Sequence, residues 1–271
     1  MEKIKENQRL ENWVEMQLSM GRFGFSLEAL RQSFVVQSET AIKFALKRLV
    51  DKGKIISIFK GYYLIIPPQY ASNGVLPPVI FLDGFMKFLD RPYYLALLNA
   101  AAFHGASHQQ PQEFFVVTSF PVLRQTKKKG LKINYISVKE IPEKLLEIRK
   151  TESGYLKISN PVLTATNLIQ FEKRVGGINR VVTVLNELAE AIMPDDFNNL
   201  ILANTSVTAL QRLGYILDKV IENKVLADAL YQALMRSRTK FFRIPLKAST
   251  PINGFSSDQR WKVIINTEID K

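Results

Sequence analysis

The chain of 271 residues contains no cysteine. This absence excludes disulfide bonds and thiolate metal sites, and it fits a reducing compartment. The first residues, MEKIKENQRLENW, are polar and include no apolar core of a signal peptide. The longest apolar runs, such as Val79–Leu82 and Val263–Ile265, are far too short to cross a bilayer. We therefore expect a cytoplasmic protein that makes no use of a membrane.

Histidine is almost as scarce, because the chain has only two. His104 and His108 have the spacing of metal ligands on a helix, but Gly105 is expected to end that helix and remove the shared face. A Walker A motif and a G-x-G-x-x-G motif are both missing, and Gly176-Gly177 is better explained as a turn between helices. The sequence thus predicts no cofactor, no metal site and no enzyme.

Acidic residues are outnumbered, 25 against 37 lysines and arginines, which gives a formal net charge of +12. A basic balance of this size favours a polyanionic partner. Residues 1–76 hold 11 basic and 7 acidic residues, a net of +4, so the remainder carries 26 against 18, a net of +8. Both parts of the chain are therefore expected to be basic.

The N-terminal part shows helix signals followed by strand signals. Residues 8–20 carry apolar side chains at helical spacing, and Ser26 and Ser38 are good N-caps for two further helices. Gly53 suits the left-handed end of the third helix. Two β-rich runs follow, Lys54–Ile58 and Tyr62–Ile66, separated by a tight turn. This order predicts a winged helix-turn-helix domain over residues 1–76.

A winged helix-turn-helix indicates DNA binding, since its third helix can enter the major groove and its wing can reach an adjacent phosphate. A lysine on a helix face can also be merely solvated, and some winged helices bind proteins instead. The candidate contacts to double-stranded DNA are on the third helix and at the tip of the wing: Ser38, Glu39, Thr40, Lys43, Lys47, Lys60 and Gly61.

Residues 77–271 predict a larger domain in which strands and helices mix, so the fold class of the chain is α+β. A helix is expected at Pro92–Phe103, strands at Glu113–Thr118 and Leu131–Val138, several helices from Pro161 onward, and a last strand at Arg260–Asn266.

A basic loop joins the expected strands Glu113–Thr118 and Leu131–Val138. This loop is either a solvated hairpin loop or a second nucleic-acid contact. Its basic residues are Arg124, Lys127, Lys128, Lys129 and Lys132.

The chain also resembles the antitoxins of AbiE-type abortive-infection systems. The resemblance rests on the winged helix and on the order of five segments: YYLALLNAAAFHGASHQQPQEFFVVT (93–118), NPVLTATNLIQF (160–171), GGINRVVTVLNELAEAI (176–192), LQRLGYILDKV (210–220) and RWKVIIN (260–266). It implies a bacterial type IV antitoxin, encoded beside a nucleotidyltransferase-like toxin, that binds repeats in its own promoter and represses the operon. It further implies a C-terminal domain that counters the toxin without a stable complex.

Two other functions stay open on the residues alone. One is a winged-helix transcription factor whose C-terminal domain senses a ligand or a partner. The other is a DNA-processing enzyme that uses the winged helix for targeting.

Overall fold

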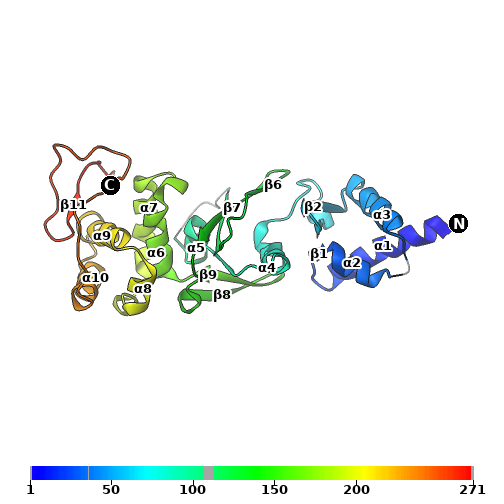
Figure 1. The fold of residues 1–271 in the computed structure, drawn as a ribbon, viewed down its shortest axis with the longest axis horizontal. Coiled ribbons are helices and arrows are strands. Elements are labelled where there is room, and N and C mark those ends of the chain that lie inside the picture. The colour runs from blue at the N-terminus through cyan, green and yellow to red at the C-terminus, as the bar shows by residue number, and fades with distance from the viewer. Residues whose placement is uncertain (1, 36, 107–112, 270–271) are drawn as a thin grey trace. The chain divides into compact units, whose positions relative to one another are not determined.

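The computed structural model describes residues 2–35, 37–106 and 113–269, with side chains from residue 10 onward (Figure 1). The chain divides into two compact units. The first comprises Met1–Tyr94, Gln112–Ile141 and Ile148–Lys157, and the second comprises Leu95–Pro111, Pro142–Glu147 and Ile158–Lys271. The boundary at 76/77 expected from the sequence stays a prediction.

The first six elements form a winged helix. They are α1 (Glu2–Ser19), β1 (Gly24–Ser26), α2 (Leu27–Ser33), α3 (Glu39–Asp51), β2 (Ile55–Phe59) and β3 (Tyr62–Ile65). The three strands pair antiparallel in the order β1-β3-β2. The mixed α+β class with an N-terminal winged helix is thus confirmed, and β1 is an addition that the sequence signals did not indicate.

The core of the winged helix joins one face of each helix to the sheet. Buried side chains come from all three helices and from β1, β2 and β3: Leu10, Val14, Phe25, Leu30, Ile42, Ala45, Leu46, Leu49, Ile55 and Ile65. Trp13 closes this core edge-to-face against Phe25, with ring centroids 5.2 Å apart. Because one face of α3 is buried in this core, only the opposite face of this helix is available to a partner.

The segment after the wing contains a helix that the sequence analysis did not predict. A turn of 3-10 helix, η1 (Pro68–Tyr70), leads to α4 (Pro78–Phe88), which begins with proline at its first position. Proline is favoured there because the amide it lacks has no partner in the helix. Tyr62 of β3 lies 4.9 Å from the ring of Phe88 and 5.2 Å from that of Phe85. The winged helix therefore packs directly on α4 through aromatic side chains.

A six-stranded mixed sheet follows, with the order β6-β7-β5-β4-β9-β8. Its strands are β4 (Tyr93–Leu95), β5 (Phe114–Ser119), β6 (Thr126–Lys128), β7 (Leu131–Val138), β8 (Leu146–Thr151) and β9 (Gly154–Ser159). β5 pairs parallel with β7, β6 antiparallel with β7, and β4 parallel with β9.

The helix expected at Pro92–Phe103 is wrong in its first half. The chain there forms β4, and α5 (Leu97–Phe103) begins only after Ala96, whose φ and ψ of −132° and 179° are extended. The run is buried on every side, and such a run gives no periodicity that separates strand from helix.

The second unit is mainly helical. After α5 it contains α6 (Pro161–Gln170), α7 (Ile178–Leu188), α8 (Asn199–Asn204), α9 (Val207–Tyr215) and α10 (Lys224–Arg236). Short 3-10 turns are η2 (Glu143–Leu145), η3 (Glu172–Arg174), η4 (Ala189–Ala191) and η5 (Pro194–Asp196), and a π-helical turn, η6 (Ile216–Val220), extends α9. α6 packs against α5, α7 and α9, and eight of its residues are buried.

A buried aspartate fixes the C-terminal segment to these helices. Asp218 in η6 accepts hydrogen bonds from Lys224 Nζ (2.7 Å), Arg260 (3.2 Å) and the indole nitrogen of Trp261 (3.0 Å). The Trp261 ring lies so close to Gly214 of α9 that a Cβ there would be 2.0 Å from Cζ3. We call Asp218, Lys224, Arg260 and Trp261 the Asp218 cluster.

The last predicted strand, Arg260–Asn266, is also wrong in extent. The regular strand is only β11 (Val263–Ile264), paired parallel with β10 (Ile244–Pro245). Lys262 has a positive φ of 56°, and this interrupts the extended backbone just before β11.

Within the described residues, every helix is too short or too polar to cross a lipid bilayer.

Candidate nucleic-acid interface

The start of α3 is held by local side-chain interactions. Ser38 Oγ accepts a hydrogen bond from the Ala41 amide at 3.2 Å, so this hydroxyl acts as the N-cap. Glu39 forms an ion pair with Arg31 of α2 at 2.7 Å. Two of the sequence-predicted contacts, Ser38 and Glu39, therefore already have partners within the winged helix.

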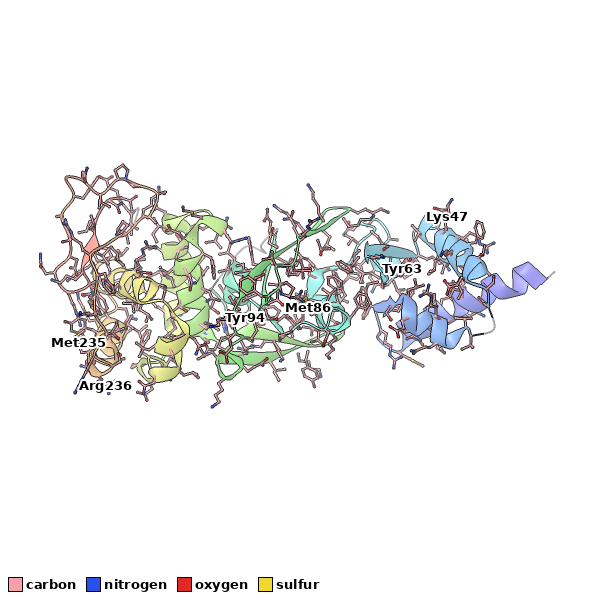
Figure 2. All side chains as sticks on the ribbon, viewed as in Figure 1. Lys47, Tyr63, Met86, Tyr94, Met235 and Arg236 are labelled. Atoms are coloured by element: carbon pink, nitrogen blue, oxygen red, sulfur yellow. The ribbon has the colours of Figure 1, made fainter. Side chains whose placement is uncertain are left out.

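The outward face of α3 is the best-placed surface for a groove. Thr40, Lys43, Phe44 and Lys47 are all exposed, and their spacing puts them on one side of the helix. The opposite side is buried in the core. Figure 2 shows Lys47 on the outer side of α3. We call these four residues the α3 face.

Other lysines of the winged helix are neutralised by α1. Lys52 lies 3.5 Å from a carboxylate oxygen of Glu11, and Lys54 contacts Glu11 at 2.5 Å and Glu15 at 3.2 Å. The hydrogen bond from Lys54 lowers the pKa of Glu11, and the same bond raises the pKa of Lys54. These charges therefore compensate one another on the side of the domain where α1 meets the start of β2.

The lysines of the α3 face have no such compensation. Among the residues whose side chains are described, no carboxylate lies within 4 Å of Lys43, Lys47, Arg48 or Lys60. The domain therefore combines one set of paired lysines with one set of free cations, and the free set lies on α3 and the wing.

At the tip of the wing, Lys60 is more accessible to a partner than Gly61. Lys60 is exposed. Gly61 has a φ of 81°, and its carbonyl accepts a hydrogen bond from the Leu27 amide at 2.8 Å. A Cβ on Gly61 would lie 3.8 Å from Phe88 Cζ. Gly61 thus shapes the turn and packs near α4, while Lys60 faces solvent.

The basic loop is a tight β-hairpin between β6 and β7. Its turn residues Lys129 and Gly130 both have positive φ, 43° and 82°, as a two-residue type I′ turn requires. Lys127, Lys128 and Lys129 are exposed and have no ion pair among the described residues. We call these three the hairpin lysines.

The remaining basic residues of this segment differ from the hairpin lysines. Lys132 stands opposite Lys127 in the register and forms an ion pair with Glu113. Asn134 donates a second hydrogen bond to Glu113 at 2.8 Å. The hydrogen bond from Lys132 lowers the pKa of Glu113. The charge of Lys132 is therefore compensated, whereas Arg124 is exposed ahead of β6.

The structure brings the hairpin close to the winged helix. β6 packs against β2, the first strand of the wing (Figure 1). The side chain of Lys129 lies 3.6 Å from the position that a Cβ on Gly74 would take. The free cations of the hairpin and of the wing thus belong to one compact unit.

Sequence reasoning missed Phe44, which is 61% exposed in the middle of the α3 face. The signal was its spacing, since Phe44 follows Thr40 by four positions and precedes Lys47 by three. Phe44 is neither polar nor charged, so it does not share the chemistry of the side chains predicted to contact DNA.

Histidine and carboxylate clusters give no alternative site within the described part of the chain, where no group of three or more such residues could hold a metal ion. The Nε2 atom of His104 lies 2.8 Å from the Ser159 carbonyl oxygen, which places this ring at the end of α5 in a structural contact. His108 lies outside the described residues.

Comparisons with known proteins agree with this architecture. The chain is similar in fold to the crystal structure of the RV2827C protein from Mycobacterium tuberculosis, with a TM-score of 0.67 and 16% identity, over 93% of this chain and 89% of that one. No curated protein matches the chain. Residues 94–219 match the family model of the AbiEi antitoxin C-terminal domain, which confirms the resemblance to AbiE-type antitoxins. Over residues 94–219 the chain is therefore similar to the C-terminal domain of AbiEi antitoxins.

Proposed function

We propose that this antitoxin binds double-stranded DNA at repeats in its own promoter through the winged helix and represses its operon. Its C-terminal domain counters a nucleotidyltransferase-like toxin without forming a stable complex with it. The protein acts by binding and performs no catalysis.

One observation carries the DNA-binding part of the proposal. The lysines near α1 are paired with Glu11, whereas Lys43, Lys47 and Lys60 are exposed and without a carboxylate partner among the described side chains. Free cations on a groove-sized helix replace condensed counterions on DNA, and the release of those ions favours binding. Lysines that already have a carboxylate partner gain much less from a phosphate.

From their positions we assign a different role in DNA binding to each group of residues. Thr40 and Lys43 lie near the N-terminal end of α3, the part of a recognition helix that meets base edges. Lys60 at the wing tip suits a phosphate or the adjacent minor groove. The hairpin lysines suit phosphates only, since they sit on a two-residue turn with no helix to enter the groove.

The antitoxin part of the proposal is supported by the family domain at residues 94–219. α3 lies outside that segment. Repression and toxin neutralisation therefore depend on different residues, and variants on the α3 face separate the two activities in the intact chain.

The DNA-binding part is tested by a gel shift with the duplex upstream of the gene and a scrambled duplex. Lys43→Ala is expected to reduce the ratio of the two affinities, because one good base contact discriminates by about 1–3 kcal/mol. Lys52→Ala is the matched control, since Lys52 is an exposed lysine next to α3 that is paired with Glu11. Equal affinity of the wild type for both duplexes contradicts sequence-specific repression.

The antitoxin part is tested by co-expression with the neighbouring toxin gene. A full-length variant with Lys43→Ala and Lys47→Ala is expected to rescue growth like the wild type and to lose repression of a promoter reporter. Size-exclusion chromatography of the two purified proteins is expected to show separate peaks. Failure of this folded variant to rescue growth contradicts the separation of the two activities, and co-elution contradicts the absence of a stable complex.

A further inference from the structure

The α3 face contains one side chain, Phe44, that has neither a charge nor a polar group to bind a phosphate. Phe44 is 61% exposed, although Trp13 of α1 packs against Phe25 of β1 and against Phe34, which follows α2. Among the described residues, no aromatic ring lies against Phe44. Leaving a phenyl ring in water costs free energy that burial against a partner recovers.

The surroundings of Phe44 restrict what that partner can be. Lys43 precedes it, Lys47 follows one turn later, and both cations lack a carboxylate partner among the described side chains. An apolar protein surface placed on Phe44 would desolvate these two ammonium groups without compensation, which is costly. The partner must therefore present an apolar group within a field of negative charge.

DNA offers one such group in the major groove. The C5-methyl of thymine projects into that groove and accepts apolar contacts from side chains that include phenylalanine, between two rows of phosphates. Lys43 and Lys47 lie on either side of Phe44 along α3, and phosphates lie on either side of the methyl group in the groove. The charges of the two surfaces are therefore complementary.

We propose that Phe44 reads thymine in the promoter repeats by contacting its C5-methyl group in the major groove. The inference rests on the proposed DNA-binding function and adds a specificity residue and a base to it. Each repeat bound by one copy of α3 then contains at least one thymine whose methyl group is required for full affinity.

The test replaces every thymine of the upstream duplex by deoxyuridine, which keeps base pairing and removes only the methyl groups. The wild type is expected to bind the uracil duplex about fourfold more weakly for each contacted methyl, which corresponds to ~0.8 kcal/mol. The Phe44→Ala variant is expected to bind both duplexes equally, with the affinity that the wild type shows for the uracil duplex.

Phe242→Ala is the matched control, because Phe242 is 57% exposed and lies outside the winged helix. This variant is expected to respond to uracil as the wild type does. The comparison of the two duplexes uses the wild type alone, so it does not depend on the folding of a variant. Because Phe44 is exposed, its truncation to alanine is expected to have only a minor effect on folding.

The outcomes separate the inference from the proposed function. If the wild type prefers the upstream duplex to scrambled DNA but ignores uracil, the thymine contact is wrong and DNA binding stands. If Phe44→Ala responds to uracil as strongly as the wild type, another residue reads the methyl groups. If Phe44→Ala changes the oligomeric state without DNA, Phe44 belongs to a protein contact. If the wild type shows no preference for the upstream duplex, the proposed function fails as well.

Discussion

The Asp218 cluster leads to a quantitative prediction for the variant Asp218→Asn. The carboxylate is 2% exposed and contacts Lys224, Arg260 and the Trp261 indole. Burial alone raises the pKa of Asp218, but hydrogen bonds from Lys224 and Trp261 and the nearby ammonium groups outweigh it and bring the pKa to about 2. The charged form is therefore strongly favoured in the folded protein.

The size of the effect follows from the shift. The ordinary value is 3.8, and each unit of pKa corresponds to about 1.36 kcal/mol, so the charge contributes about 2 kcal/mol to folding at neutral pH. For a chain of this length this predicts a Tm lower by roughly 4–8 °C in Asp218→Asn. Because the folded-state pKa is the lower one, the contribution is complete above about pH 4 and is lost as the pH falls toward 2.

The assay compares thermal unfolding of the full chain at pH 7, 5 and 3. The difference between wild type and Asp218→Asn is expected to be equal at pH 7 and 5 and smaller at pH 3. Asp228→Asn is the matched control, since Asp228 pairs with the same Arg260 at 2.5 Å but is 55% exposed, and an exposed pair contributes only about 0.2–1 kcal/mol. Equal destabilisation by the two variants at pH 7 would refute the argument from burial.

Two further predictions concern packing and salt dependence. Gly214→Ala is expected to lower the free energy of unfolding by about 1–3 kcal/mol, because its Cβ would overlap the Trp261 ring, and Trp261→Leu is expected to reduce this loss in a double-mutant cycle measured by urea unfolding. Replacement of all three hairpin lysines by alanine is expected to make the plot of log affinity against log salt shallower by up to about 3, whereas Lys132→Ala, whose charge is paired with Glu113, is expected to leave the slope unchanged. Identical slopes for wild type and the triple variant would show the hairpin to be a solvated surface.

Much of the winged helix could be predicted because its signals are local. Ser26 and Ser38 cap α2 and α3 as expected, each accepting a hydrogen bond from an amide three residues later. α4 was missed because Pro77 supplies no side-chain cap and the helix is apolar on most sides. β1 was missed because three residues give no measurable alternation, and Gly24–Ser26 becomes a strand only by pairing with β3.

The cations of the candidate interface could also be predicted from the sequence, but whether each has a carboxylate partner could not. Lys43 and Lys54 look alike in the sequence, yet Lys54 is neutralised by Glu11, 43 positions earlier, and Lys43 has no carboxylate partner among the described side chains. Only tertiary contacts decide which charge is free. Tertiary contacts also join two segments on which the family resemblance rests. Asp218 in segment 210–220 accepts hydrogen bonds from Arg260 and Trp261 in segment 260–266.

The packing of the wing on α4 has a thermodynamic consequence. Tyr62 contacts Phe88, and Asp83 of the same helix accepts a hydrogen bond from Tyr93 of β4 at 3.0 Å. The winged helix therefore shares its stability with the six-stranded sheet. In the proposed complex, promoter DNA at 100 times its dissociation constant adds about 2.7 kcal/mol to the folded state that binds it, and we expect the winged helix and the sheet to share this gain. Amide hydrogens of β5 and β7 are then expected to exchange more slowly when DNA is present, although the proposed contact lies on α3.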